Sequence, residues 1–291
     1  QGAGGHPAGS MQLLSGDTDT RDKPKPRLPD WMSVTNYMRS QDGPRQNPLP
    51  SYVGINPPLE YNGPAYLGDA YQPFVVSGDP NQPSFTVPHV GTAAGRDGER
   101  LDRRVALRRQ FDSLERAIER QADFQALDQF ESQAMTLLTN PRTRDAFDLS
   151  KEPSSVRDRY GWNAYGQRGL MARRLVEAGC PFVTMVWENP FPGKPIPNGC
   201  TYNWDSHAVN CHIFEDSKWR FPPYDQAVSA LIEDLHARGL NRRVLLVVTG
   251  EFGRTPRLER NKGTETRVLQ PGRDHWPQAM SFIVSGGSMR T

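Results

Sequence analysis

The sequence predicts an α/β domain with a three-layer α/β/α architecture, in which helices cover both faces of a mainly parallel sheet. The first observation is the order of elements after Pro153, where helical patterns alternate with short apolar runs. The second is the run Val244–Thr249, which is continuously apolar or β-branched and therefore suits a strand buried on both faces. The predicted elements of this α/β core, residues 153–291, are helices over 160–178 and 223–237 and strands over 182–187, 244–249 and 280–284.

The segments before the core are predicted to be less regular. A short helix over 9–14 is ended by Ser15 and Gly16. Residues 21–97 are rich in Pro, Gly, Asn and Tyr, so we expect a long, mostly irregular insertion, which packs over the core because its many aromatic side chains need burial. Residues 99–140 carry apolar residues at helical spacing among charged ones, which predicts an amphipathic helix or helix pair.

The bulk composition restricts the classes of function. The 291 residues include 35 Lys and Arg and 33 Asp and Glu, for a formal net charge of +2, which gives no case for a nucleic acid or an anionic membrane as partner. No apolar run approaches transmembrane length. The chain begins without Met and stops just after a strand-like run, so we expect a fragment of a single domain that lacks sequence at both ends.

Three polar clusters follow the predicted strands or lie in the loops after them. They contain Asp205 and His207 in NWDSH, Glu251 in GEFGRT, and Asp274 and His275 in GRDHWP. Carboxylates with imidazoles are the usual ligands of a divalent transition ion, and parallel sheets bind ligands beyond the carboxyl ends of their strands. We therefore expect the clusters to converge on one polar or metal site, the alternative being unrelated turns held by side-chain hydrogen bonds.

The cysteines in the loop around NWDSH leave three possibilities open. Cys200, His207, Cys211 and His212 could form a zinc knot, although their spacing matches no common finger pattern. A Cys200–Cys211 disulfide would close this loop if the protein is exported. Two unpaired buried thiols are the simplest alternative.

Several motifs carry a resemblance to a known family. EFGRTP, then GRDHWP and an apolar strand ending in Gly-Gly, resemble the bacterial domain-of-unknown-function family 1501, which is similar to the alkaline phosphatase and sulfatase superfamily. Other matching stretches are HPAGSMQLLSGD, RDRYG, LMARRLVEAGCPFVTMVWE and WDSH, so the resemblance covers nearly the whole chain. It implies one partial alkaline-phosphatase-like domain over residues 1–291. It also implies export, since many members resemble exported proteins with a twin-arginine signal at the end that is missing here.

The resemblance further implies a site for a divalent ion such as Ca, Zn, Mg or Mn. Asp205 and His207 stand closest to the superfamily's Asp and His ligands, and His275 matches a later His ligand. Glu251 and Phe252 fill the place of a second Asp-His pair, so the carboxylate is kept and the imidazole is lost. This departure predicts a site with one metal ion, or a reshaped site, rather than a two-metal site.

Two more residues are candidates for a catalytic role. In sulfatases the nucleophile stands at the start of a helix that ends in Thr-Gly, and by this registry its position falls on His6. This histidine could ligate the metal, act as a general base or act as the nucleophile. The planar fork of Arg254 suits a sulfate, phosphate or carboxylate group; alternatively, Arg254 forms an ion pair with Glu251 or Asp274 that only makes the turn rigid.

The leading hypothesis is a metal-dependent hydrolase of sulfate or phosphate esters, acting on a small-molecule or carbohydrate ester. The alternative is a non-catalytic relative that binds an anionic carbohydrate or a cell-surface partner through the same cleft. The clustered Asp, His and Glu residues favour the enzyme, whereas the missing sulfatase nucleophile favours the binding protein. The sequence leaves the substrate and the oligomeric state open.

Overall fold

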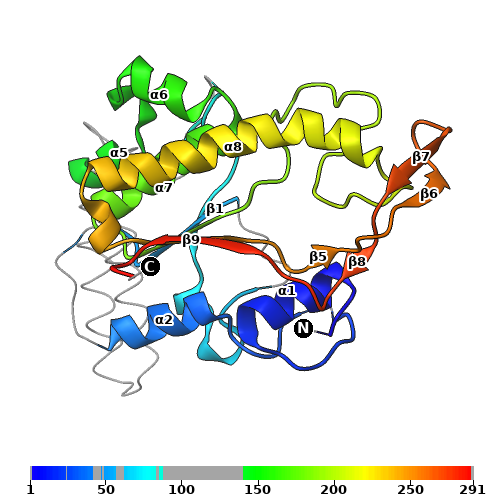
Figure 1. Ribbon diagram of the computed structural model, residues 1–291. Helices are drawn as coiled ribbons and strands as arrows, with labels where there is room; N and C mark the ends of the chain where they lie inside the picture. Colours follow the sequence, from blue (N-terminus) through cyan, green and yellow to red (C-terminus); the bar gives the residue numbers. More distant parts are fainter. Residues whose placement is uncertain are drawn as a thin grey trace.

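Helices lie on both sides of the strands in the computed structural model of this chain (Figure 1). The structure describes residues 2–23, 25–41, 47, 49–56, 62–82, 85–87 and 140–289. The segment 99–139, for which an amphipathic helix or helix pair is predicted, lies outside these residues. No helix in the described ranges has both the length and the apolarity needed to cross a bilayer.

A parallel sheet of three strands forms the centre of the fold. Strand β1 (Tyr52–Ile55) lies between β2 (Phe74–Val76) and β3 (Phe182–Met185) and pairs with both in parallel. All four residues of β1 are buried. The sequence did not reveal β1 and β2, which lie within the region 21–97 that is predicted to be mostly irregular. Runs of three or four residues, one of them interrupted by Gly54, are too short to show a period of two.

The helices on one side of this sheet are α5 (Pro141–Phe147), α6 (Ser154–Tyr160), α7 (Ala164–Glu177) and α8 (Ile213–Ala237) (Figure 1). The predicted helix over 160–178 corresponds to α7 and does not include the turn before it, since Gly161 has a positive φ of 89°. Asn163 then caps α7 by accepting a hydrogen bond from the backbone N–H of Gly166. Helix α8 begins ten residues before the predicted start at 223. The prediction placed the start at the prolines, but Pro222 and Pro223 lie inside the helix.

The strand pair β4 (Leu245–Thr249) and β9 (Phe282–Gly286) corrects the prediction for the C-terminal strands. These strands pair with each other in antiparallel orientation and form a sheet separate from the parallel one. Strand β4 is not buried on both faces, since the side of Leu245 and Val247 is open and Leu245 is 53% exposed. Between β4 and β9 the chain forms only hairpin strands, and a parallel return would need a long crossover, usually a helix.

The chain between β4 and β9 forms two small antiparallel ladders. Strand β5 (Gly253–Arg254) pairs with β8 (His275–Trp276), and β6 (Glu259–Lys262) pairs with β7 (Leu269–Gly272). In the first ladder Arg254 lies directly opposite His275. This register brings together two of the predicted site residues, although 20 positions separate them in the sequence.

Helices α1 (His6–Ser15) and α2 (Trp31–Ser40) lie on the other side of the strands (Figure 1). The predicted helix over 9–14, with its end at Gly16, is thereby confirmed, and the helix begins at His6. The N-terminal end of α1 lies beside β5 and β8 (Figure 1). The short 3₁₀ helices are Ala65–Leu67, Asp69–Tyr71, Leu149–Lys151 and Leu240–Arg242.

A buried ion-pair network joins α7 to its neighbours. The guanidinium of Arg173 is 1% exposed and lies 2.7 Å from Glu152, 2.7 Å from Glu177 and 2.8 Å from Asp234. Glu152, which precedes α6, also pairs with Arg174. These contacts fasten α7 to α8 and to the segment before α6, on the side of the molecule away from the polar clusters.

Candidate metal centre

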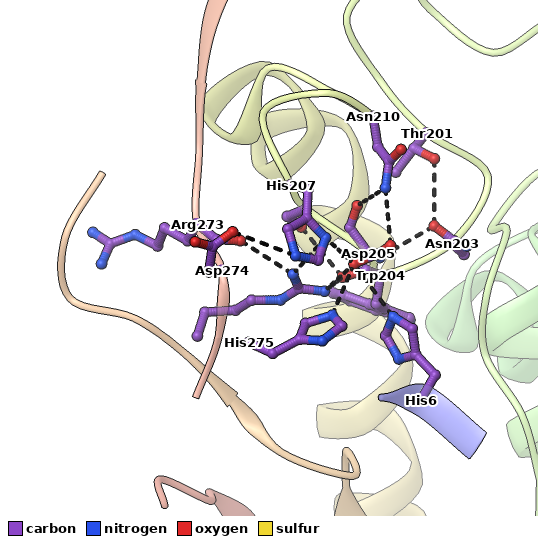
Figure 2. Close-up of polar contacts among 12 residues, drawn as sticks. His6, Thr201, Asn203, Trp204, Asp205, His207, Asn210, Arg273, Asp274 and His275 are labelled. Carbon is purple, nitrogen blue, oxygen red and sulfur yellow. Dashed lines mark hydrogen bonds and ion pairs between the residues drawn. The ribbon is translucent and has the colours of Figure 1, made fainter. Parts of the chain in front are cut away.

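Three segments that are far apart in the sequence meet at one carboxylate, Asp205 (Figure 2). They are the start of α1, the loop between β3 and α8, and the β5–β8 ladder. Figure 2 shows the side chains of His6, His207 and His275 directed toward Asp205 from these segments. The structure thus brings together residues that the strand-end argument predicted to converge.

One oxygen of Asp205 is surrounded by nitrogen atoms. Its Oδ1 lies 2.6 Å from Nδ1 of His207, 2.7 Å from Nη2 of Arg254, 3.2 Å from Nε2 of His275 and 3.3 Å from Nε2 of His6. Burial alone would raise the pKa of Asp205, but hydrogen bonds from His275, His6 and Arg254 outweigh it and hold this pKa far below its usual range. Asp205 is therefore ionised at neutral pH.

His6, Asp205 and His275 could together hold a metal ion. Each offers one ligand atom, these atoms lie within 4.8 Å of one another, and they form the one such group of three or more found among the described residues. The Nδ1 atoms of both histidines have other partners, because Nδ1 of His6 lies 2.5 Å from Glu251 and Nδ1 of His275 lies 2.5 Å from the carbonyl oxygen of Gly4. Metal-binding histidines are usually oriented in this way, through the ring nitrogen that does not bind the metal.

The Nε2 atom of His6 fits a cation site in a further respect. It is buried, and it has no hydrogen-bond partner of good geometry, although it lies near Asp205. The protonated ring has Asp205 as its ion-pair partner, at 3.3 Å. A cation between His6, Asp205 and His275 would take the place of that proton.

Two carboxylates set the charge state of His6. Hydrogen bonds to Asp205 and then to Glu251 raise the pKa of His6 to about 9, against the opposing effect of burial. Burial raises the pKa of Glu251, but the hydrogen bond from His6 outweighs it and leaves this pKa below its usual value. An ion that binds at Nε2 must therefore displace a proton from His6 at neutral pH.

Local sequence features place His6 at the edge of the centre. Pro7 is suited to the first turn of α1, and Asp22 accepts a hydrogen bond from the N–H of Ala8 at 3.1 Å, which caps this end of the helix. Gly5 allows the close approach, since a Cβ at this position would lie 2.6 Å from the carboxylate of Asp22. The glycine at position 5 thus has a steric reason.

The loop that carries Asp205 is held by polar contacts at both of its ends. Asn203 accepts a hydrogen bond from the N–H of Asp205 at 3.1 Å, and Nδ2 of Asn210 donates to Oδ2 of Asp205 at 2.9 Å. The buried Arg220 of α8 donates to the carbonyl oxygen of Thr201 at 2.5 Å. These contacts fix the direction of the Asp205 carboxylate independently of the histidines.

His207 and Asp274, both predicted as metal ligands, lie next to this group of three. Nδ1 of His207 faces Asp205, and its Nε2 lies 3.5 Å from Oδ1 of Asp274. Burial lowers the pKa of His207. Neither residue belongs to the group of ligand atoms that lie within 4.8 Å of one another. Their geometry fits a role beside the ion better than a role as its ligands.

Arg254 pairs with Asp205, and the predicted pairing with Glu251 or Asp274 is not what the structure shows. Its Nη2 donates to Oδ1 of Asp205 at 2.7 Å and to the carbonyl oxygen of Trp204 at 3.0 Å, and its Nη1 donates to the carbonyl oxygen of Arg273 at 3.1 Å. The guanidinium thus ties the Asp205 loop to the β5–β8 ladder. Because both of its terminal nitrogens already have protein partners, the anion-binding role is less well supported than a positioning role.

Phe252 is a part of the centre whose contribution the sequence did not reveal. Its ring centroid lies 4.4 Å from that of His275 and 5.4 Å from that of His6. The sequence identified this position only as one where a histidine is missing. The structure shows that the aromatic ring packs against both candidate ligands.

The predicted zinc knot is not formed. Cys200, His207, Cys211 and His212 do not appear as a group able to hold a metal within the part of the chain that the structure describes. Cys200 and Cys211 are thiols in the structure. Of the remaining alternatives, the structure has two unpaired thiols, with Cys211 buried and Cys200 partly buried.

Fold and site together define an α/β protein with a histidine–carboxylate centre that could hold a metal ion. The family model described as "Protein of unknown function (DUF1501)" matches residues 1–291, so the chain belongs to this family. No curated protein and no solved structure matches the chain.

Proposed function

We propose that this protein is a metal-dependent hydrolase of sulfate or phosphate esters, with one divalent cation held by His6, Asp205 and His275. The observation that carries the proposal is the convergence of three ligand atoms, one each from His6, Asp205 and His275, within 4.8 Å of one another, with Nε2 of His6 buried. Two imidazoles and a carboxylate favour a transition ion such as Zn²⁺ over Ca²⁺, Mg²⁺ or Mn²⁺, which prefer ligand sets rich in oxygen.

A bound cation supplies Lewis-acid stabilisation of charge on an ester oxygen and activates water at neutral pH. The residues of the chain have supporting roles in this proposal. Glu251 and the Gly4 carbonyl orient the two imidazoles, and Arg254 fixes the Asp205 carboxylate. His207, whose pKa is lowered by burial, is neutral at pH 7 and can take up a proton next to Asp205.

The alternative function is binding without turnover of an anionic carbohydrate or a cell-surface partner. One observation favours it: by the family resemblance, His6 stands where sulfatases have their nucleophile. In this case the centre would still hold its cation and bind the anion through it. Export of the protein is part of both proposals and rests on the family resemblance alone.

Metal analysis combined with an ester assay tests the proposal. The full chain is loaded with Zn²⁺ or Mn²⁺, dialysed and assayed with p-nitrophenyl sulfate and p-nitrophenyl phosphate. We expect about one equivalent of bound metal and chelator-sensitive hydrolysis, both lost in Asp205→Asn and both kept in Asp225→Asn, a change of an exposed carboxylate on α8. Bound metal without hydrolysis of any ester would favour the binding alternative, and a wild-type protein that binds neither ion would refute both.

A further inference from the structure

The β6–β7 hairpin (residues 257–272) concentrates positive charge at the edge of the molecule. Figure 1 shows it at the upper right, where it extends beyond the β5–β8 ladder. The segment contains four Lys and Arg but only two Asp and Glu, so its formal net charge equals the +2 of the whole chain of 291 residues. The small net charge of the chain gives no case for an anionic partner, but this local surface does.

One face of this hairpin packs against the loop between β3 and α8. Gln270 is 1% exposed and donates from Nε2 to the carbonyl oxygen of Ala208 at 2.8 Å. Successive side chains of a strand point to opposite faces, and Leu269, the neighbour of Gln270, lies opposite Lys262 in the ladder. Leu269, Lys262 and Arg260, which is two positions before Lys262, therefore share the outer face of the hairpin.

The cations of the hairpin are not paired within the described part of the chain. Arg257, Arg260, Lys262 and Arg267 are all exposed. None of their side chains takes part in an ion pair or a hydrogen bond with the residues that the structure describes. By the alternation along β6, Glu259 lies on the inner face, away from Arg260 and Lys262. The charge of these four side chains is thus available to an anionic surface.

The hairpin also exposes aliphatic side chains. Val268 is 61% exposed, Leu269 is 66% exposed and Leu258 is 40% exposed. Exposed apolar patches rimmed by polar residues mark sites of interaction with proteins or membranes. Surfaces that bind single nucleic acid strands use aromatic side chains on which bases stack, and residues 257–272 include none. Cations beside aliphatic groups favour a lipid surface, since its anionic headgroups attract the cations and its acyl chains accept the aliphatic groups.

We propose that the β6–β7 hairpin binds the surface of an anionic lipid bilayer. Its four cations lie among the headgroups, and Val268 and Leu269 enter the boundary between the headgroups and the acyl chains. The hairpin extends from the β5–β8 ladder, which carries Arg254 and His275, so this contact would hold the candidate metal centre close to the bilayer. The proposal does not depend on the proposed function, because no residue of the hairpin belongs to the metal centre.

Vesicle flotation of the purified full chain tests the proposal. The protein is mixed with vesicles of phosphatidylcholine, with or without phosphatidylglycerol, at low and at high salt, and heparin–agarose serves as a polyanion without acyl chains. We expect flotation with the anionic vesicles only, reduced at high salt because exposed charges are screened. Absence of flotation with the anionic vesicles would overturn the proposal, and retention on heparin in that case would identify a site for a polyanion instead. Equal flotation with both kinds of vesicle would also overturn it.

Paired substitutions separate the contributions of charge and of apolar contact. Arg260→Gln/Lys262→Gln should weaken binding to the anionic vesicles by about 25-fold, since each cation near a charged bilayer contributes about fivefold. Val268→Ser/Leu269→Ser should weaken binding by about tenfold and leave its dependence on salt unchanged, because only apolar contact is lost.

Two cations at the other end of the molecule provide a matched control. Arg142 and Arg144 are exposed on α5, which Figure 1 shows on the opposite side from the hairpin. Arg142→Gln/Arg144→Gln should bind the vesicles as the wild type does. All substituted side chains are exposed, so the Tm of each variant should match that of the wild type, and its measurement verifies that each variant is folded. If either hairpin variant binds as this control does, the hairpin is not the surface that contacts lipid.

Discussion

Replacing Glu251 tests how the centre prepares His6 for a cation. Its Oε1 lies 2.5 Å from Nδ1 of His6, so it holds the ring with Nε2 turned toward Asp205. Glu251→Gln keeps an acceptor oxygen at this position but removes the charge, whereas Glu251→Ala removes both. His6→Ala removes the proposed ligand itself.

The structure ranks the expected loss of metal affinity in these three variants. Removing the partner that orients a metal-binding histidine costs about 10–100-fold in metal affinity, which is about 1.4–2.7 kcal/mol. Glu251→Gln retains the hydrogen bond and should lie near tenfold, and Glu251→Ala should lie near 100-fold. His6→Ala should exceed 100-fold, because one of three protein ligands is lost. Glu251 is partly exposed, so the free energy of unfolding should change little in either variant.

The pH of the measurement matters for this series. Glu251 helps to raise the pKa of His6 to about 9, so at neutral pH an incoming ion must displace a proton. Loss of Glu251 lowers this pKa and eases the displacement, which offsets part of the lost affinity at pH 7. The deficit of the variants should therefore be larger at pH 8.5 than at pH 7.

The assay is competition for Zn²⁺ against a chelator of known affinity, at both pH values, with Glu265→Gln as a control for loss of a carboxylate on an exposed loop. The control should bind zinc as the wild type does. If both Glu251 variants match the wild type at pH 8.5 while His6→Ala does not, Glu251 has no orienting role. If His6→Ala also matches it, the proposed ligand set is wrong.

The remaining predictions concern the packing behind the centre. Arg173→Met removes a buried cation and leaves Glu152 with Arg174 and Asp234 with Arg238, so it should lower the free energy of unfolding by about 3 kcal/mol, the low end for a broken buried pair, in thermal or denaturant unfolding; a loss below about 1 kcal/mol would contradict this. Burial raises the pKa of Glu152, but hydrogen bonds from Arg173 and another arginine outweigh it, so this pKa is lowered. The ionised form therefore stabilises the fold above the unfolded pKa of about 4.3, and this stability is lost as the pH falls through the lower folded value. In Glu152→Gln, the free energy of unfolding should fall less steeply as the pH is lowered through this range. Gly272→Ala would place a Cβ 2.0 Å from the backbone nitrogen of Ala208, so the loop that carries the centre must shift and zinc affinity should fall; an unchanged affinity and Tm would show that the loop adapts without cost.

The sequence predicted those elements that have a long or strongly apolar pattern. Helices α7 and α8 and the strand β3 were located within a few residues, except where a cap or an internal proline moved the boundary. Strands β1 and β2 were missed, because tertiary contacts rather than a local pattern make segments of three and four residues into strands. The partner of β4 could not be predicted either, since an apolar run is equally compatible with parallel and antiparallel pairing.

For the candidate centre, the sequence predicted which residues converge, but not which of them face the cation site and which orient their neighbours. Asp205 and His275 were expected at one site because both follow apolar elements, and they lie 3.2 Å apart. That Glu251 faces Nδ1 of His6, rather than a cation, depends on side-chain directions that no spacing of motifs reveals. The same holds for Arg254, whose pairing with Asp205 follows from the register of the β5–β8 ladder.

The environment of His6 indicates why a single cation suits this centre. Phe252 and His275 pack against its imidazole on two sides, with ring centroids 5.4 and 4.4 Å away. A phenyl ring offers no atom that could bind a metal, so Phe252 adds an apolar group and no further ligand next to His6. Nε2 of His6 is buried. A cation at this nitrogen would take the place of the proton that pairs His6 with Asp205, and because the atom is shielded from water, the attraction between the cation and the carboxylate would be screened less than at the surface.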